Sequence, residues 1–184
     1  MRGSSGSIRV IAGRWRGTRI AVADLEALRP TPDRVRETLF NWLAPELPGA
    51  RCLDLFAGTG ILGFEAVSRG AARCDLVERD AVLVANMTAL RQRLDADTIS
   101  LHRADARQWL AQPPRLYDLV FIDPPFHAGL VAGVLDRITQ GWLAPQGLVY
   151  VECEREATFE HAALTPHRAG TTQHIRYTLL RYTG

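Results

Sequence analysis

Apolar and polar residues along this 184-residue chain fall into blocks that alternate between strand-like and helix-like periods. Five short apolar runs have the length and composition of buried strands, at 51–56, 73–78, 99–103, 116–122 and 147–152. The segments that follow the first four runs repeat with helical spacing, at 61–67, 81–94, 106–110 and 130–139. Strands that alternate with helices predict an α/β fold with a mostly parallel sheet.

A different pattern follows the fifth strand. No convincing helix separates the segment near Leu164 from residues 172–182. Two consecutive strands there would form an antiparallel hairpin at the far edge of the sheet, which predicts seven strands in all.

The chain before the first strand also divides into elements. Residues 8–22 alternate apolar and basic positions around a glycine-containing turn, which predicts a β-hairpin. Beyond it, Thr31 or Asp33 can cap a helix whose apolar stripe ends at Leu43. The predicted organisation is a disordered tail, a basic hairpin extension and one large α/β domain, over 1–7, 8–28 and 29–184.

The first predicted strand runs into a turn that holds Gly58, Gly60 and Gly63. Glycine has no Cβ, so its backbone can approach a ligand closely, and the helix that follows offers free N–H groups and a partial positive charge. A strand, a glycine turn and a helix in this order are typical of the first unit of a nucleotide-binding sheet. A plain connection between a strand and a helix is the alternative.

Ligands of such sheets bind beyond the carboxyl ends of the strands, so the residues at these ends are the candidates for function. Glu78 ends the second strand, 18 residues after Gly60, where a carboxylate can accept from both hydroxyls of a ribose. Asp105 follows the third strand and can accept from an adenine amino group. These positions predict a cofactor that contains adenosine.

The fourth strand ends in Asp123-Pro124-Pro125-Phe126. Two consecutive prolines remove two N–H donors, so the Asp123 carboxylate and the Pro124 carbonyl form a pocket that only accepts hydrogen bonds. A planar –NH₂ group on a nucleobase fits this pocket, and Phe126 offers a ring for stacking. The glycine fingerprint alone also suits a nicotinamide-dependent oxidoreductase, but a hydride acceptor has no need of such a pocket.

Charge is unevenly distributed, although the formal net charge is only +2. All 22 basic residues are arginine, and five of them precede Asp24 with no acidic residue among them. Arg14, Arg16 and Arg19, with Trp15 beside them on an exposed hairpin, suit a nucleic-acid backbone and unstacked bases. A solvated, arginine-rich hairpin packed on the edge of the domain is the alternative.

Composition excludes several classes of protein. Apolar content of 47% and charged content of 23% are typical of a globular protein. No apolar run approaches the ~20 residues that span a bilayer and no signal peptide is evident, so we expect a cytoplasmic protein. Cys52, Cys74 and Cys153 are expected in the core. Neither they nor the five histidines have metal-ligand spacing, so no metal is expected.

Three parts of the chain carry a resemblance to a known family. They are 14–17 (Arg-Trp-Arg-Gly), 29–45 (Arg-Pro-Thr-Pro-Asp-Arg-Val-Arg-Glu-Thr-Leu-Phe-Asn-Trp-Leu-Ala-Pro), and 53–60 (Leu-Asp-Leu-Phe-Ala-Gly-Thr-Gly) paired with 123–126. The last pair is shared by many amino methyltransferases, whereas the second part is far more specific. From Ile8 to about Glu152 the chain resembles the RsmD family of 16S rRNA guanine-N2 methyltransferases, which use S-adenosyl-L-methionine.

The resemblance implies a Rossmann-like class I methyltransferase domain, with an N-terminal hairpin that grips rRNA. The implied cofactor-binding residues are Thr31, Asp54, Phe56, Ala57, Gly58, Gly60, Glu78, Arg79, Asp105 and Ala106. The implied catalytic residues are Asp123, Pro124, Pro125 and Phe126. The implied RNA contacts are Arg9, Arg14, Trp15, Arg16, Arg19, Arg34 and Arg36. The expected partner is 16S rRNA in the 30S subunit or its assembly intermediate, read by shape and phosphate by a monomer.

A guanine amine is a poor nucleophile because its lone pair is delocalised into the ring. Acceptors at Asp123 and Pro124 would draw this amine toward a tetrahedral geometry, and Phe126 would stack on the flipped base. The same motif serves enzymes that methylate adenine N6 or a protein glutamine, so these targets stay open, as does the nicotinamide class. Stabilisation by S-adenosylhomocysteine but not by NADH would separate the two classes of cofactor.

Overall fold

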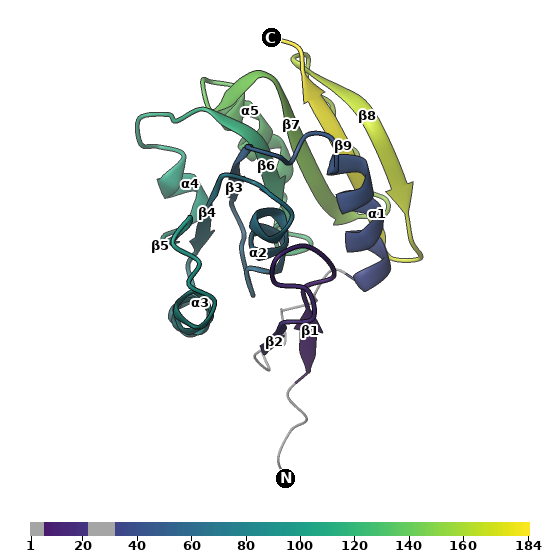
Figure 1. Ribbon diagram of the computed structural model, residues 1–184. Coiled ribbons are helices and arrows are strands. Elements are labelled where there is room, and N and C mark those ends of the chain that lie inside the picture. The colour runs from purple at the N-terminus through teal and green to yellow at the C-terminus, as the bar shows by residue number, and fades with distance from the viewer. Residues whose placement is uncertain (1–5, 22–31) are drawn as a thin grey trace.

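The computed structural model describes residues 6–21 and 32–184 of the chain. Over these residues, seven strands form one sheet in the order β5-β4-β3-β6-β7-β9-β8 (Figure 1). The parallel strands are β3 (Arg51–Asp54), β4 (Arg73–Glu78), β5 (Ile99–Arg103), β6 (Tyr117–Ile122) and β7 (Leu143–Glu154). The antiparallel strands at one edge are β8 (Leu164–Thr171) and β9 (Ile175–Tyr182). The predicted seven-stranded sheet with its C-terminal hairpin is confirmed.

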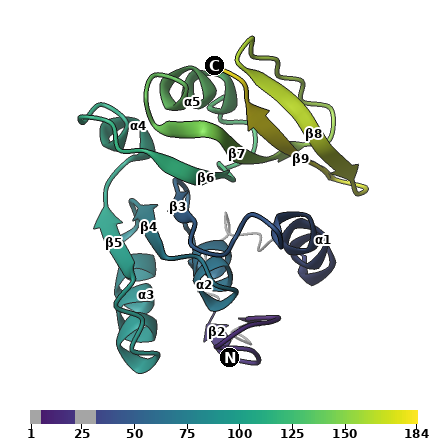
Figure 2. The same ribbon diagram turned by 45° about the horizontal axis from the view of Figure 1, so that its top comes forward.

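Helices cover both faces of this sheet (Figure 2). One face carries α1 (Asp33–Leu43), α2 (Ile61–Ser68) and α3 (Ala81–Arg93), and the other carries α4 (Ala106–Trp109) and α5 (Val131–Ile138). Successive residues of a strand point to opposite faces, so Cys52 packs in the first layer and Leu53 in the second. A central strand buried on both sides reads as a continuous apolar run, which is why the sequence pattern predicted these strands well.

Several boundaries differ from the predictions by a few residues, among them the following. Strand β7 begins at Leu143 rather than at residue 147, because Pro145 and Gln146, which has a positive φ of 63°, interrupt the apolar pattern. Helix α1 has Pro32 at its N-cap with no side-chain cap, and Asp33 is its first helical residue instead of its cap. Strand β1 starts at Ser7, which the tail was predicted to include.

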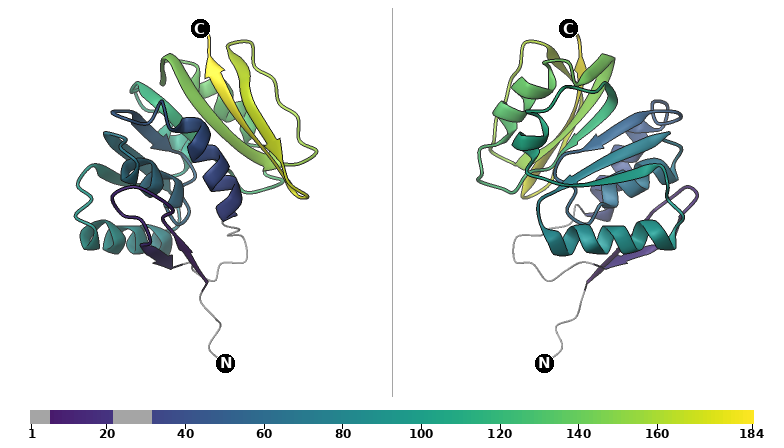
Figure 3. Two further views of the ribbon diagram at one scale, coloured as in Figure 1. Left: turned by 45° about the vertical axis from the view of Figure 1, so that its right-hand side comes forward. Right: turned by 90° about the vertical axis from the view of Figure 1, so that its left-hand side faces the viewer.

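The predicted N-terminal hairpin is present. Strands β1 (Ser7–Arg9) and β2 (Arg19–Ala21) pair antiparallel, with buried Ile8 opposite buried Ile20. The hairpin lies beside α2 and α3 on the face that also carries α1 (Figure 3). The rest of the predicted tail, at residues 1–5, and the segment 22–31, which contains Arg29 and Thr31, lie outside the described residues. None of the helices within the described ranges is long and apolar enough to cross a membrane.

Candidate active site

A cavity of about 420 Å³ opens at the carboxyl ends of strands β3 to β7. The structure thus brings the residues at the strand ends together around one space, as the parallel sheet predicts. The predicted cofactor-binding and catalytic residues that line this cavity are Asp54, Phe56, Ala57, Gly58, Glu78, Arg79, Asp105, Ala106, Asp123, Pro124, Pro125 and Phe126. Of the remaining two, Gly60 is buried and does not line the cavity, and Thr31 belongs to the segment that is not described.

The glycine turn takes its shape from backbone that other residues rarely adopt. Gly58 and Gly60 have positive φ angles of 54° and 79°. A Cβ added to Gly60 would also lie 2.8 Å from Sδ of Met87, so this residue serves the turn and the packing behind it. A Cβ added to Gly63 would lie 2.2 Å from Cδ2 of Leu76, which shows that this glycine lets α2 pack tightly on β4. Ile61 and Leu62, the first residues of α2, line the cavity, so the turn places the N-terminus of this helix at the cavity wall.

Glu78 fixes the turn from the neighbouring strand. Its carboxylate accepts hydrogen bonds from the backbone N–H groups of Gly58, at 2.9 Å, and of Asp80, at 2.8 Å. These bonds hold the carboxylate at the cavity wall in one orientation. Each carboxylate oxygen has two lone pairs, so Glu78 can still accept from the hydroxyls of a ligand.

Asp105 has a structural role beside its predicted one. Its carboxylate caps α4 by accepting from the backbone N–H of Arg107 at 2.9 Å, and the guanidinium of Arg107 lies 3.2 Å away. The hydrogen bonds from Arg107 lower the pKa of Asp105 and keep it ionised. The side chain is consequently fixed as an acceptor at the edge of the cavity.

Asp54 is the most deeply buried acidic group of the cavity wall, at 1% exposure. Burial raises its pKa to about 7, although the backbone N–H groups of Phe56 and Gly63 oppose the rise. Neither carboxylate oxygen reaches hydrogen-bond geometry with a donor of the described residues. A buried carboxylate in this state is costly, and a cationic group entering the cavity would offset that cost.

The loop after β6 is held by the end of β7. Pro124 is buried, and Phe126 is partly buried with its ring packed against the core. His127, which has a positive φ of 61°, donates its backbone N–H to the carboxylate of Glu154 and thereby lowers the pKa of that group. This bond fixes the loop that carries the Asp-Pro-Pro-Phe motif.

Glu152 is a cavity residue that the sequence analysis missed. It ends the predicted fifth strand, lines the cavity and is only 3% exposed. The O–H of Tyr150, two residues earlier on the same face of β7, donates to Oε2 of Glu152 at 2.9 Å. The rule that selected the residues at the other strand ends would have selected Glu152 as well.

Two of the predicted RNA contacts are buried, so the prediction that Trp15 is exposed on the hairpin is wrong. Trp15 is 7% exposed because its ring packs on Phe64, with a centroid separation of 6.2 Å. Arg36 is fully buried and contacts protein groups instead of solvent. Its Nη2 donates to the backbone carbonyl of Arg9 at 3.0 Å and to Asp33 at 2.7 Å. Burial lowers the pKa of Arg36, and Asp33 opposes this shift.

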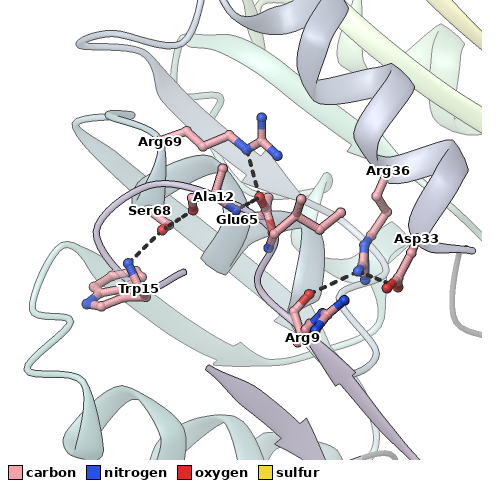
Figure 4. Close-up of polar contacts among 9 residues, drawn as sticks. Arg9, Ala12, Trp15, Asp33, Arg36, Glu65, Ser68 and Arg69 are labelled. Carbon is pink, nitrogen blue, oxygen red and sulfur yellow. Dashed lines mark hydrogen bonds and ion pairs between the residues drawn. The ribbon is translucent and has the colours of Figure 1, made fainter. Parts of the chain in front are cut away.

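The hairpin is attached to α2 by two polar side chains of that helix, Glu65 and Ser68 (Figure 4). The Glu65 carboxylate accepts from the backbone N–H groups of Ile11, at 2.7 Å, and Ala12, at 3.0 Å. It also accepts from Nε of Arg69 at 2.7 Å.

Ser68 joins the next part of the hairpin. Its hydroxyl accepts from the backbone N–H of Trp15 at 2.9 Å and donates to the backbone carbonyl of Ala12 at 2.7 Å. The hairpin loop also approaches closely at Gly13, where an added Cβ would lie 1.9 Å from the Ser68 carbonyl oxygen. We call Glu65 and Ser68 with these contacts the hairpin clamp.

The other predicted RNA contacts keep an exposed surface. They are Arg9, Arg14, Arg16, Arg19 and Arg34. The guanidinium of Arg14 lies 5.5 Å from the centre of the Trp15 ring. These arginines lie outside the cavity, and their role in RNA binding stays a prediction.

Comparison with known proteins identifies the family. The family model described as "Conserved hypothetical protein 95" matches residues 8–181. The chain belongs to this family. The small subunit rRNA methyltransferase D of Escherichia coli K12, a relative of this chain, is 46% identical over 153 residues, which cover 83% of this chain and 77% of that protein.

Solved structures agree with this assignment. The Escherichia coli protein yhhF superposes with a TM-score of 0.89 at 38% identity, covering 97% of this chain and 99% of that one. An RNA methyltransferase from Salinibacter ruber, in complex with S-adenosyl-L-homocysteine, shares the fold with a TM-score of 0.65 at 16% identity, over 84% of this chain and 94% of that one. This family member thus has the fold of class I methyltransferases. Within the described residues, no group of three or more His, Cys, Asp or Glu side chains could hold a metal.

Proposed function

We propose that this protein transfers a methyl group from S-adenosyl-L-methionine to the exocyclic N2 amine of a guanine in 16S rRNA. The observation that carries the proposal is the joining of two sites in one cavity. The glycine turn and Glu78 line one part of it, and Asp123 with Pro124 line another. Membership of the family supports the reaction class, and the name of its Escherichia coli relative supports the substrate class.

The residues of the cavity suit S-adenosyl-L-methionine. The buried Asp54 carboxylate meets the backbone N–H groups of Phe56 and Gly63 only outside hydrogen-bond geometry, and it would accept from the ammonium of the methionine part. Glu78 would hold the ribose hydroxyls, and Asp105 would lie by the adenine. When bound, this cofactor supplies a methyl group on a positively charged sulfur.

The protein's part in the reaction is to orient and activate the amine. The Asp123 carboxylate and the Pro124 carbonyl would accept the two N–H bonds of the target amine and draw its lone pair out of conjugation. The amine gains the methyl group and must lose one proton, for which Asp123 is the adjacent base. Phe126, fixed by its packing and by the His127–Glu154 bond, would stack on the flipped base.

The RNA would be held by the exposed arginines of the hairpin and of α1. Arg9, Arg14, Arg16, Arg19 and Arg34 have their charges in solvent, where they can neutralise phosphates. The large exposed apolar side chains of the described residues include no aromatic ring that could stack on unstacked bases, which favours recognition of a folded RNA by its shape and phosphates. We therefore favour the 30S subunit, or an intermediate of its assembly, as the substrate.

Single-turnover transfer of a labelled methyl group to 30S particles tests this function. The particles come from a strain that lacks the enzyme, and the RNA is digested to nucleosides after the reaction. We expect the label in N2-methylguanosine. Label in N6-methyladenosine or on a ribosomal protein would overturn the substrate, and stabilisation by NADH without stabilisation by S-adenosylhomocysteine would overturn the cofactor.

A further inference from the structure

Asp123 and Glu152 are neighbours at the carboxyl ends of two adjacent strands. Strands β6 and β7 are parallel, and Ile122 of β6 pairs with Val151 of β7. Asp123 and Glu152 directly follow these two paired residues. Adjacent strands lie about 4.8 Å apart, and both side chains line the same cavity. The Asp-Pro-Pro-Phe motif therefore has a second carboxylate beside it.

Glu152 is held in position by a rigid neighbour. Tyr150, which is fully buried, donates its O–H to Oε2 of Glu152 at 2.9 Å. The Tyr150 ring packs edge-on against Phe121, with centroids 6.3 Å apart. A carboxylate fixed in this way is pre-organised to receive a ligand group at the cavity wall.

The chemistry of the nucleobases shows which ligand a second acceptor favours. Guanine presents two adjacent donors, the N2 amine and the ring N1–H. Adenine presents its N6 amine beside N1, which is an acceptor, so a carboxylate there would face a lone pair. A second carboxylate beside the amine pocket thus favours guanine and opposes adenine.

We propose that Glu152 is a specificity-determining residue that accepts a hydrogen bond from N1–H of the target guanine. Tyr150 is the positioning residue that orients the Glu152 carboxylate. The inference rests on the proposed function, in which Asp123 and Pro124 bind the N2 amine of the same base.

An analogue of guanine separates recognition of N1–H from recognition of the amine. In 2-aminopurine the target amine is kept, but N1 is an acceptor. The target nucleotide is first mapped by mass spectrometry, and 16S rRNA is then prepared by ligation with guanine or 2-aminopurine at that position and assembled into particles. The measured quantity is the ratio of kcat/KM for guanine to that for 2-aminopurine.

The wild-type protein is expected to prefer guanine by roughly 10–100-fold, since a hydrogen bond to a charged acceptor is lost. In Glu152→Gln the amide can turn its NH₂ toward the analogue, so the ratio should fall by about tenfold. Other differences between the two bases cancel when the two proteins are compared. Tyr150→Phe should lower the ratio in the same direction by a smaller factor, and Glu156→Gln, an exposed glutamate beyond β7, should leave it unchanged.

The following outcomes would each contradict either the proposed role of Glu152 or the proposed function. A Glu152→Gln protein with the wild-type ratio would show that Glu152 does not read N1–H. A loss of S-adenosylhomocysteine affinity in Glu152→Gln as large as its loss of rate would make Glu152 a cofactor ligand. A wild-type protein that methylates no guanine would overturn the proposed function and this inference with it. If Glu152→Gln does not fold, the ratio of Tyr150→Phe decides, and an unchanged ratio overturns the role of Glu152.

Discussion

Glu65 in the hairpin clamp and Asp54 in the cavity are both buried carboxylates, at 0% and 1% exposure, yet their surroundings are opposite. Glu65 accepts from three donors of the protein, at 2.7, 3.0 and 2.7 Å. Asp54 reaches hydrogen-bond geometry with no described donor, and burial raises its pKa to about 7. The satisfied carboxylate stabilises the fold, and the unsatisfied one costs stability, a cost that the proposed ligand would offset. The two carboxylates are buried to the same extent, so their hydrogen-bond donors, and not their burial, distinguish the structural role of Glu65 from the binding role proposed for Asp54.

The largest expected effect breaks the hairpin clamp. Glu65→Ala leaves the Ile11 and Ala12 N–H groups and the Arg69 guanidinium without their acceptor, which should lower the free energy of unfolding by about 3–5 kcal/mol. Denaturant titration measures this. Glu46→Ala is the matched control, because Glu46 pairs with Arg181 at the exposed surface and should contribute no more than about 1 kcal/mol. Equal losses in the two variants would remove the distinction between clamp and surface pair.

The next effect concerns catalysis in the cavity. Asp123→Ala should slow single-turnover methyl transfer by roughly 10²–10³-fold, since it removes an acceptor that acts on the amine in the transition state. Unfolding free energy and affinity for S-adenosylhomocysteine should change little. Asp97→Ala, which removes an exposed aspartate, serves as the control. Wild-type turnover by a folded Asp123→Ala protein would sink the mechanism.

Asp54 should show its cost as a dependence of stability on pH. The pKa of Asp54 is about 7 in the folded protein and near 3.8 in the unfolded protein. Between about pH 4 and pH 7 the folded protein therefore keeps a proton on Asp54 that the unfolded protein has lost, and the free energy of unfolding falls as pH rises. Asp54→Asn lacks this loss. Its stability relative to wild type should therefore increase from pH 4 to pH 8 by an amount on the order of 2–4 kcal/mol. Thermal unfolding of both proteins across this range measures the difference, and a flat difference contradicts the buried, ionisable state.

The same substitution sharpens the comparison with Glu65. Because an amide cannot form an ion pair with an ammonium, Asp54→Asn should weaken S-adenosylhomocysteine binding while it stabilises the ligand-free protein at pH 8. Glu65→Ala should do the reverse, with lower stability and little change in the affinity of the folded protein for this ligand. Calorimetric titration of both variants at pH 8 separates these outcomes.

The smallest expected effect is on the outer surface of the hairpin. Replacing Arg14, Arg16 and Arg19 with alanine should leave cofactor affinity unchanged and reduce the salt slope of RNA binding by about 2, since up to three phosphate contacts are lost. Arg137, Arg155 and Arg168, which are exposed elsewhere, provide a control triple variant with the same change in charge. A salt slope equal in both triple variants would mean that the hairpin does not contact the RNA backbone.

The sequence predicted the cavity better than the hairpin for a physical reason. Parallel strands all present their carboxyl ends at one edge, so the positions of Glu78 and Asp123 in their strands were enough to bring them together. The hairpin has no such rule. Its aromatic residue Trp15 was assumed to face solvent, whereas it packs inward on Phe64 of α2. In the neighbouring helix α1, Arg36 is likewise buried, against Arg9 and Asp33.

One signal in the sequence could have located the clamp. Glu65 is the only charged residue in α2, a helix that is otherwise nearly all apolar and buried. A charge in such a helix is rarely buried without a partner, so its presence indicates a segment from elsewhere in the chain. The place of Asp33 was less predictable, because it lies inside the first turn after Pro32 and its carboxylate accepts from Arg36.

The length of α2 sets the distance and the relative orientation between the glycine turn and the hairpin clamp. Its N-terminus faces the cavity and its last turn holds the hairpin, and its eight residues span about 12 Å. Inserting one residue would turn everything beyond it by about 100° and direct Glu65 away from Ile11 and Ala12. Relatives that keep both the glycine turn and the clamp should therefore tolerate conservative substitutions in this helix outside Gly63, Glu65 and Ser68, but no insertion or deletion.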